Sequence, residues 1–139
     1  MQVLVDTCIW SLALRRQAKH LSATETLLRE ELSNLIEEGR AQLIGPIRQE
    51  LLSGIREAAQ FERLRENLRA FPDEPLTVTD YELAARLGNQ CRAKGIAGSA
   101  IDFLICAVAL ERNWPIFTYD EDFKAYGNAI PIRLLALRR

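Results

Sequence analysis

Short apolar segments alternate with longer stretches of helical periodicity along this chain of 139 residues. Val3–Val5 is apolar and too short for a helix, and residues 42–44 and 76–78 have the same character. Because crossover helices cover both faces of a parallel sheet, this alternation predicts parallel strands between helices. Further strands are expected in "WPIFTYD" and "IPIRLL". We therefore expect an α/β fold, a central and mostly parallel β-sheet flanked by α-helices, in a single domain over residues 1–139.

The helical segments have apolar residues three and four positions apart and residues that suit helix ends. Ser22 is a candidate N-cap for a helix that stops at Gly39, and Pro46 suits the start of the next helix. "SAIDFLICAVALERN" is the most apolar helix and is expected at the centre of the fold. The other helices are expected at residues 56–70, in "TDYELAARLGNQCRAKG" with Thr79 or Asp80 as its cap, and in "EDFKAYG".

Composition excludes several classes of protein. The net charge of −1 does not indicate a nucleic-acid or membrane partner. Three cysteines without C-x-x-C spacing suggest neither a disulfide framework nor a zinc site. The sequence shows no signal-peptide pattern, and its longest apolar run is too short to span a bilayer. We expect a cytoplasmic protein without a membrane partner.

Carboxylates follow two of the expected strands. Asp6 ends "VLVD" and Asp120 ends "PIFTYD", so both should lie beyond the carboxyl ends of strands, where ligands bind to parallel sheets. Asp102 lies at the start of the central helix, and Glu50 in the first turns of the helix after the second strand. Asp122 follows Asp120 closely. These acids are expected to converge at one edge of the sheet.

Each of these acids also has an ordinary structural explanation, which for Asp6 is a capping or hydrogen-bonded role. Ser99 and Asp102 form an S-x-x-D capping pattern, and Asp120 can cap the helix that follows it. Asp122 can interact favourably with a helix dipole, and Glu50 can be a surface glutamate. For these residues both interpretations stay open. If all of the acids had only structural roles, their placement at one edge of the sheet would be a coincidence.

Asp6 is the acid that scaffold roles explain least, since it lies among apolar residues without a basic neighbour in sequence. Clustered carboxylates repel by roughly 4 kcal/mol per pair at 4 Å and an effective dielectric near 20, which a cation would relieve. Oxygen ligands favour Mg²⁺ or Mn²⁺, ions that stabilise charge on phosphoryl oxygens. Thr7 and Thr118 can hydrogen-bond the ligands, or simply serve local structure.

Four motifs in order, "VLVDTCIW", "IRQELLSGI", "SAIDFLICAVAL" and "PIFTYDEDF", resemble the PIN-domain ribonucleases, and among them the VapC-like toxins of bacterial toxin–antitoxin pairs. The resemblance covers essentially the whole chain. It implies a PIN-like fold, a Mg²⁺ or Mn²⁺ site, endonucleolytic cleavage of RNA, homodimers and a cognate VapB-like antitoxin.

The resemblance also implies residue roles. The family's catalytic metal ligands fall on Asp6, Glu50, Asp102 and Asp120, and the role of Asp122 stays open. Two positions depart from the family pattern: Cys8 stands where small polar residues are frequent, and Phe103 where leucine is usual. Neither change removes a ligand.

Basic residues near the start of the chain have two open interpretations. Arg15, Arg16 and Lys19 can contact RNA phosphates or form a solvated face. His20, in the same polar connection, is interpreted as a solvated loop residue. The helix after Ser22 has a broad apolar stripe made by Leu28, Leu32, Leu35 and Ile36. Either the whole stripe is core, or part of the apolar surface near it receives an antitoxin segment by helix-in-groove docking.

Three functions remain in competition. The main hypothesis is a metal-dependent endoribonuclease toxin. One alternative is a PIN-type nuclease in RNA maturation or acting on DNA, and another is a catalytically silent domain that binds RNA or protein. The retained acids argue against the silent domain, because a binding module has no use for mutually repelling carboxylates.

Overall fold

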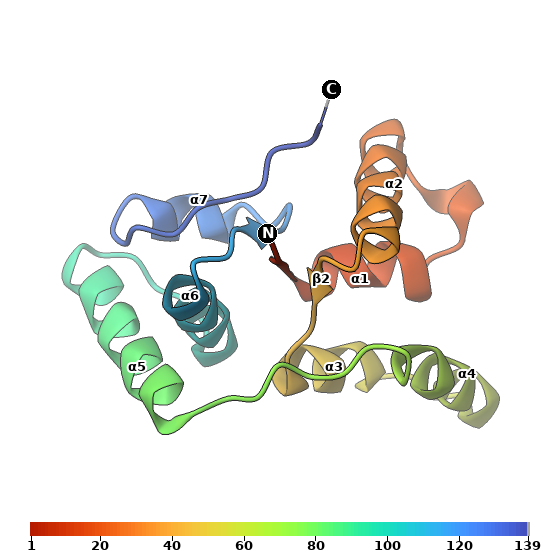
Figure 1. The fold of residues 1–139 in the computed structure, drawn as a ribbon, viewed down its shortest axis with the longest axis horizontal. Coiled ribbons are helices and arrows are strands. Elements are labelled where there is room, and N and C mark those ends of the chain that lie inside the picture. The colour runs from red at the N-terminus through yellow and green to blue at the C-terminus, as the bar shows by residue number, and fades with distance from the viewer. Residues whose placement is uncertain (139) are drawn as a thin grey trace.

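Three parallel strands form one sheet in the order β2-β1-β3 in the computed structural model, which describes residues 1–138 (Figure 1). β1 (Val3–Val5) lies between β2 (Ala41–Gln42) and β3 (Ile116–Phe117). Leu4 of β1 has a partner in both neighbouring strands. The predicted α/β class with parallel strands is therefore confirmed.

The ends of the sheet differ in detail from the prediction. The second strand was expected at residues 42–44, but β2 begins one residue earlier and ends two residues earlier, and Leu43 forms an isolated parallel bridge to Asp73. The strand expected in "IPIRLL" is reduced to one bridge, from Leu134 to Ile116. Strand pairing thus extends beyond the central three strands only through single residues.

Helices flank the sheet (Figure 1). α6 contacts β1 and β3 and packs along α5, whereas α1 packs against α2 and α3. A 3₁₀ helix, η1, connects α1 with α2. The bounds are α1 (Thr7–Leu14), η1 (Ala18–His20), α2 (Ala23–Glu37), α3 (Gly45–Leu52), α4 (Ala58–Leu68), α5 (Val78–Ala93), α6 (Ala100–Arg112) and α7 (Asp122–Gly127).

The start of α5 corrects two predictions. The strand expected at residues 76–78 is wrong, because Val78 is the first residue of α5. Its cap is Thr77, where Thr79 or Asp80 was expected. The Thr77 side chain accepts from the backbone N–H of Asp80, and the Asp80 carboxylate accepts from the N–H of Thr77, so a capping box begins the helix here.

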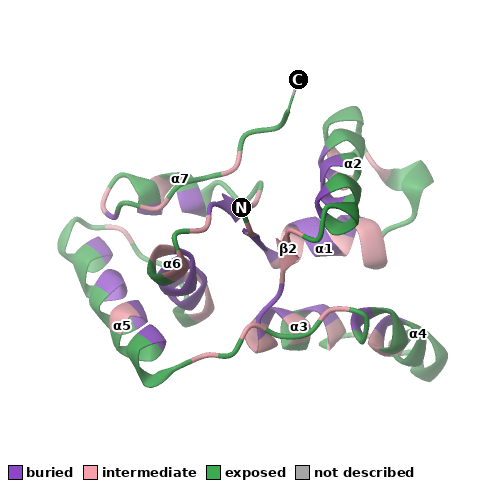
Figure 2. Cartoon of the chain, in the orientation of Figure 1, coloured by how far each residue is buried: buried purple, intermediate pink, exposed green. Residues whose placement is uncertain are grey.

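α6 occupies the centre of the core, as its composition predicts. Seven consecutive residues, 103–109, are buried, and Figure 2 shows α6 purple where α2 and α5 are purple on one side only. The apolar stripe of α2 is also core: Leu28, Leu32 and Leu35 are at most 6% exposed. These three members of the stripe are therefore core, whereas Ile36 stays 36% exposed, so docking of an antitoxin segment on the apolar surface near α2 stays a prediction.

Arg112 joins the two long helices through ionic contacts. From the end of α6 it donates two 2.8 Å hydrogen bonds to Asp80 of α5, and another to Glu74. Asp80 is 1% exposed, so this ion pair is buried.

In residues 1–138, the helices are all too short or too polar to cross a membrane.

Candidate metal centre

Asp6 leaves the carboxyl end of β1 and caps α1. One carboxylate oxygen, Oδ1, accepts a 2.8 Å hydrogen bond from the backbone N–H of Thr7. The other, Oδ2, accepts from the Thr118 hydroxyl at 2.8 Å and from the Cys8 thiol at 3.5 Å. Burial raises the pKa of Asp6, and the charge of Asp102 adds to the rise, while these hydrogen bonds oppose it. Asp6 is thus both an N-cap and a buried member of an acidic site.

Glu50 reaches this site from α3. The Thr7 hydroxyl donates a 2.6 Å hydrogen bond to Oε1 of Glu50, across 43 residues of sequence. Thr7 therefore contacts two carboxylates, one through its backbone and one through its side chain. Unlike Asp6, Glu50 is exposed.

Asp102 lies in the first turn of α6, as predicted. The Ser99 side chain accepts from the backbone N–H of Asp102 at 3.0 Å, so the capping pattern read in the sequence is real. The Asp102 side chain itself points elsewhere: its Oδ2 accepts a 2.7 Å hydrogen bond from the hydroxyl of Tyr126. Burial raises the pKa of Asp102, and the charges of Asp120 and Glu50 raise it further. Asp102 can therefore take part in the cap of α6 through its backbone and in the acidic cluster through its side chain.

Asp120 and Asp122 bring two exposed carboxylates from the segment after β3. Asp120 Oδ1 accepts from the backbone N–H of Asp122 at 2.9 Å, but the N-cap of α7 is Glu121, so the interpretation of Asp120 as the cap of this helix is wrong. One carboxylate oxygen from each of Asp102, Asp120 and Asp122 lies within 4.8 Å of the other two. Segments far apart in the sequence thus meet at the carboxyl ends of β1 and β3.

Thr118 links the deep and the exposed parts of the site. Its hydroxyl donates to Asp6, and the same oxygen accepts from the backbone N–H of Asp120 at 3.0 Å. Cys8 Sγ lies 3.4 Å from this oxygen. Burial and the charge of Asp6 raise the pKa of Cys8 to about 11, so Cys8 stays a neutral thiol near pH 7. The available charged ligands are therefore all carboxylates.

The cluster has no compensating positive charge from the described residues, 1–138. None of its five acids forms an ion pair within 4.0 Å with a lysine, arginine or histidine. Repelling carboxylates with oxygen ligands only are the donor set that Mg²⁺ and Mn²⁺ prefer. The three acids whose oxygens lie within 4.8 Å of one another, Asp102, Asp120 and Asp122, therefore fit such an ion. Asp6 and Glu50 belong to no such group among residues 1–138; Asp6 is linked to these acids through the charge of Asp102 and the hydroxyl of Thr118, and Glu50 through the hydroxyl of Thr7 and the charge of Asp102.

The hydrogen bond from Tyr126 to Asp102 was not predicted from the sequence. Tyr126 follows Asp122 by four positions in α7, which places both residues on one side of the helix. That spacing was available in the sequence, but the partner of Tyr126, Asp102, lies on another helix.

The predicted RNA-contacting residues lie in the exposed connection between α1 and α2, named the basic loop, in which Lys19 belongs to η1. Arg15 and Lys19 are exposed, and so is His20, as expected. Arg16 lies 3.4 Å from Glu25, which also accepts a 3.2 Å hydrogen bond from the hydroxyl of Tyr119. Since Tyr119 precedes Asp120, these contacts tie the basic loop to the acidic cluster.

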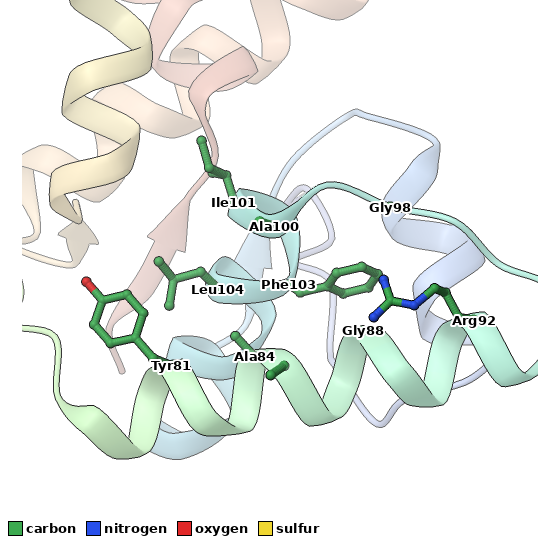
Figure 3. Close-up of a pocket in the computed structure, with 10 residues that line it drawn as sticks. Tyr81, Ala84, Gly88, Arg92, Gly98, Ala100, Ile101, Phe103 and Leu104 are labelled. Atoms are coloured by element: carbon green, nitrogen blue, oxygen red, sulfur yellow. The ribbon is translucent and has the colours of Figure 1, made fainter.

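A separate cavity of about 370 Å³ lies between α5 and α6 (Figure 3). Its lining is mostly apolar and includes Ala84, Gly88 and Leu104. None of the five clustered acids lines it. Phe103 reaches from α6 over Gly88, so one wall of this cavity belongs to the residue next to Asp102.

Comparisons with known proteins agree with this architecture. A family model described as "PIN domain" matches residues 3–129. The crystal structure of FitAcB from Neisseria gonorrhoeae is similar at a TM-score of 0.76 and 20% identity, covering 97% of both chains. VapBC2 from Rickettsia felis, bound to a promoter DNA fragment, gives 0.73 and 17%, covering 97% of this chain and 98% of that one.

A third similar structure is VapBC-1 from nontypeable Haemophilus influenzae, with a TM-score of 0.68 and 16% identity over 97% of both chains. At these identities the likeness establishes the fold. No curated protein matches the chain.

Proposed function

The chain belongs to the PIN domain family, and we propose that it is a metal-dependent endoribonuclease that acts as the toxin of a toxin–antitoxin pair. One observation carries the proposal: carboxylates from β1, α3, α6 and the segment after β3 gather without a positive partner among the described residues. Such an arrangement costs stability unless a cation binds. The gathering of these carboxylates is therefore better explained by a catalytic metal site than by structural roles of the acids.

The ion is Mg²⁺ or Mn²⁺, and Asp6, Glu50, Asp102 and Asp120 hold it, with Asp122 as a further acid at the exposed side. When bound, such an ion supplies positive charge to a phosphoryl oxygen and lowers the pKa of water. The remaining work falls to this chain's own residues.

The threonines hold the ligands in place. Thr7 fixes Asp6 and Glu50, and Thr118 fixes Asp6 while its oxygen anchors the backbone of Asp120. Hydrogen bonds of this kind orient metal ligands, and their loss typically lowers metal affinity 10- to 100-fold. We thus assign Thr7 and Thr118 a supporting role in the site.

Hydrolysis of a phosphodiester needs an acceptor for one proton of the attacking water. The water oxygen forms a bond to phosphorus, and the bond from phosphorus to the leaving sugar oxygen breaks. Glu50, Asp120 and Asp122 are the exposed carboxylates of the site, accessible to the solvent from which RNA arrives. Oε2 of Glu50, the oxygen that does not accept from Thr7, is our candidate proton acceptor.

RNA is the substrate that the basic loop supports. Arg15 and Lys19 are exposed, and Arg16 is tied through Glu25 to Tyr119 beside Asp120. Arginine and lysine side chains are frequent contacts of the phosphates in a nucleic-acid backbone. A nuclease in RNA maturation or acting on DNA is the enzymatic alternative.

The toxin role is supported by the structures that this chain resembles, which include VapBC and FitAB complexes and a toxin–antitoxin complex from Klebsiella pneumoniae. On this basis we propose a VapB-like antitoxin and a second copy of the chain as partners, and a cytoplasmic location. Co-purification of the chain with the product of a neighbouring small gene tests the first partner.

A cleavage assay tests the activity. Purified protein should cut RNA in Mn²⁺ or Mg²⁺, stop in EDTA and leave DNA intact. Asp102→Asn should lose activity by orders of magnitude, whereas Glu121→Gln, which removes an exposed acid paired with Lys124, should not. Cleavage that persists in EDTA would overturn the metal-dependent function, and equal cutting of DNA would overturn the RNA assignment.

A further inference from the structure

We propose that Tyr126 is a positioning residue of the metal centre: its hydroxyl holds one oxygen of Asp102, so that the other oxygen is left for the cation. This inference rests on the proposed function and adds a residue to it from α7. Tyr126 does not itself ligate the ion.

The contact is short and buried. The Tyr126 hydroxyl donates to Oδ2 of Asp102 at 2.7 Å, a length typical of an O–H donor on an ionised carboxylate. Tyr126 is 1% exposed. In the absence of bulk water, this hydroxyl has few alternatives to Asp102 as an acceptor, so the bond fixes both side chains.

Aromatic neighbours set the direction of the hydroxyl. The Tyr126 ring lies 5.1 Å from the ring of Phe103 and 5.2 Å from that of Phe123, with tilted and edge-on geometries. A ring held on two sides cannot swing away without opening the core. Phe103 follows Asp102 directly in α6, so the same helix supplies both the acceptor and a wall of its clamp.

Gly98 provides the room that this clamp needs. A Cβ atom at position 98 would lie 2.6 Å from the Tyr126 hydroxyl oxygen and 2.7 Å from Phe103 Cζ. Any larger residue would therefore displace the hydroxyl from Asp102. The next residue, Ser99, caps α6 through the N–H of Asp102, so two adjacent residues support this acid from its backbone and its side chain.

Repulsion makes such support necessary. The charges of Asp120 and Glu50 act on Asp102, and a free aspartate side chain can rotate away from them about its two torsions. The Tyr126 bond opposes this rotation before any cation arrives. Because Asp122 and Tyr126 share a side of α7, the same helix both adds an acid to the cluster and restrains Asp102.

Tyr126→Phe tests the proposal, since it removes the hydroxyl and keeps the ring. Mn²⁺ affinity is measured from the electron paramagnetic resonance signal of free Mn²⁺, and apo stability from melts in EDTA. We expect the dissociation constant for Mn²⁺ to rise about 10- to 100-fold, with the apo melting temperature close to that of the wild type. Tyr81→Phe, at an exposed tyrosine of α5, is the matched control and should bind Mn²⁺ like the wild type.

Gly98→Ala provides a second measurement, because it keeps the hydroxyl but moves it. This variant should also bind Mn²⁺ more weakly. If the wild type binds Mn²⁺ and both Tyr126→Phe and Gly98→Ala match its affinity, Tyr126 has no positioning role and the proposed function still stands. If the wild type itself does not bind Mn²⁺ or Mg²⁺, the proposed function fails, and this inference fails with it.

Discussion

The Thr7 hydroxyl donates a 2.6 Å hydrogen bond to Glu50, while the Thr7 backbone donates to Asp6. One residue at the start of α1 therefore sets the distance between an acid on β1 and an acid on α3. Two carboxylates repel each other. The hydrogen bonds of Thr7 hold them near each other in the absence of a cation.

Replacing Thr7 tests this bridge. Thr7→Val keeps the shape of the side chain and the backbone bond to Asp6, but it frees Glu50. Metal-dependent RNA cleavage should fall about 10-fold or more, as is typical when a hydrogen bond to a metal ligand is lost. Thr7→Ser restores the hydroxyl and should recover most of the rate. A Thr7→Val enzyme as active as the wild type would show that Glu50 does not depend on Thr7.

Asp6→Asn separates catalysis from scaffold. Asparagine caps helices about as well as aspartate, so the bond from the Thr7 N–H should persist, while one repelling charge disappears. Without metal, the free energy of unfolding should stay level or rise by about 1 kcal/mol. RNA cleavage should drop by orders of magnitude, and Mn²⁺ should no longer raise the melting temperature appreciably. A variant that melts clearly lower and still cuts RNA would make Asp6 scaffold only.

The same substitution has a pH signature. Burial and the charge of Asp102 raise the pKa of Asp6 above its unfolded value near 4, so the folded apo protein binds the proton more tightly than the unfolded chain. The stability of the apo protein therefore falls as pH rises from about 4 through the folded-state pKa. Urea unfolding in EDTA at about pH 5 and about pH 8 should show a shallower fall for Asp6→Asn. An equal fall in both proteins would exclude Asp6 as the source.

Asp80 should show the opposite dependence. Hydrogen bonds from Arg112 lower the pKa of Asp80, so its stabilisation is fully present above the unfolded value near 4 and is lost as pH falls through the folded-state pKa. Asp80→Asn leaves Arg112 with Glu74 as its charged partner among residues 1–138, beside the carbonyls of Pro75 and Val108, and should cost about 3 kcal/mol near pH 7. The difference should shrink near pH 3. The exposed Glu82→Gln on α5 is the control, and a difference that does not change with pH would contradict the ionic explanation.

The basic loop makes a prediction about salt. In an Asp102→Asn background, which binds RNA without cutting it, Arg15→Ala with Lys19→Ala should reduce the salt dependence of binding. The slope of log K against log salt should become shallower by about 1.4, or about 0.7 per lost phosphate contact. Arg63→Ala, an exposed charge on α4, should leave the slope unchanged. Equal slopes in all of these proteins would make the loop a solvated face.

The edge of the sheet where the acids lie could be predicted, because the end of a strand is marked by residues adjacent in the sequence. Val3–Val5 is apolar on both faces and stops at an acid, and parallel strands place such ends together. α1 was missed for a related reason. "TCIWSLAL" packs into the core on most sides, with Ile9, Trp10 and Leu12 buried, and so has no polar face to reveal a helical period. A capping role for Asp6 was one open interpretation, but the helix that Asp6 begins was not predicted.

The error at residues 76–78 came from choosing the wrong signal. Two apolar residues around Thr77 were interpreted as a strand, although Thr77 and Asp80 carry the T-x-x-D spacing of a capping box. Val78 stays 75% exposed as the first residue of α5, so its hydrophobicity had no structural consequence. The bond between Tyr126 and Asp102 was beyond sequence reasoning, because it depends on how the loop at Gly98 packs under α7.

The pairing of β1 with β3 also determines how much of the chain must be synthesised before the acidic site is complete. Asp6 leaves the ribosome early, but its partner Thr118 lies 112 residues later, and Asp120 follows it. A growing chain therefore carries an incomplete set of ligands until the segment after β3 has emerged. Under the proposed function, fragments that end before Thr118 should therefore not cleave the RNA from which they are translated.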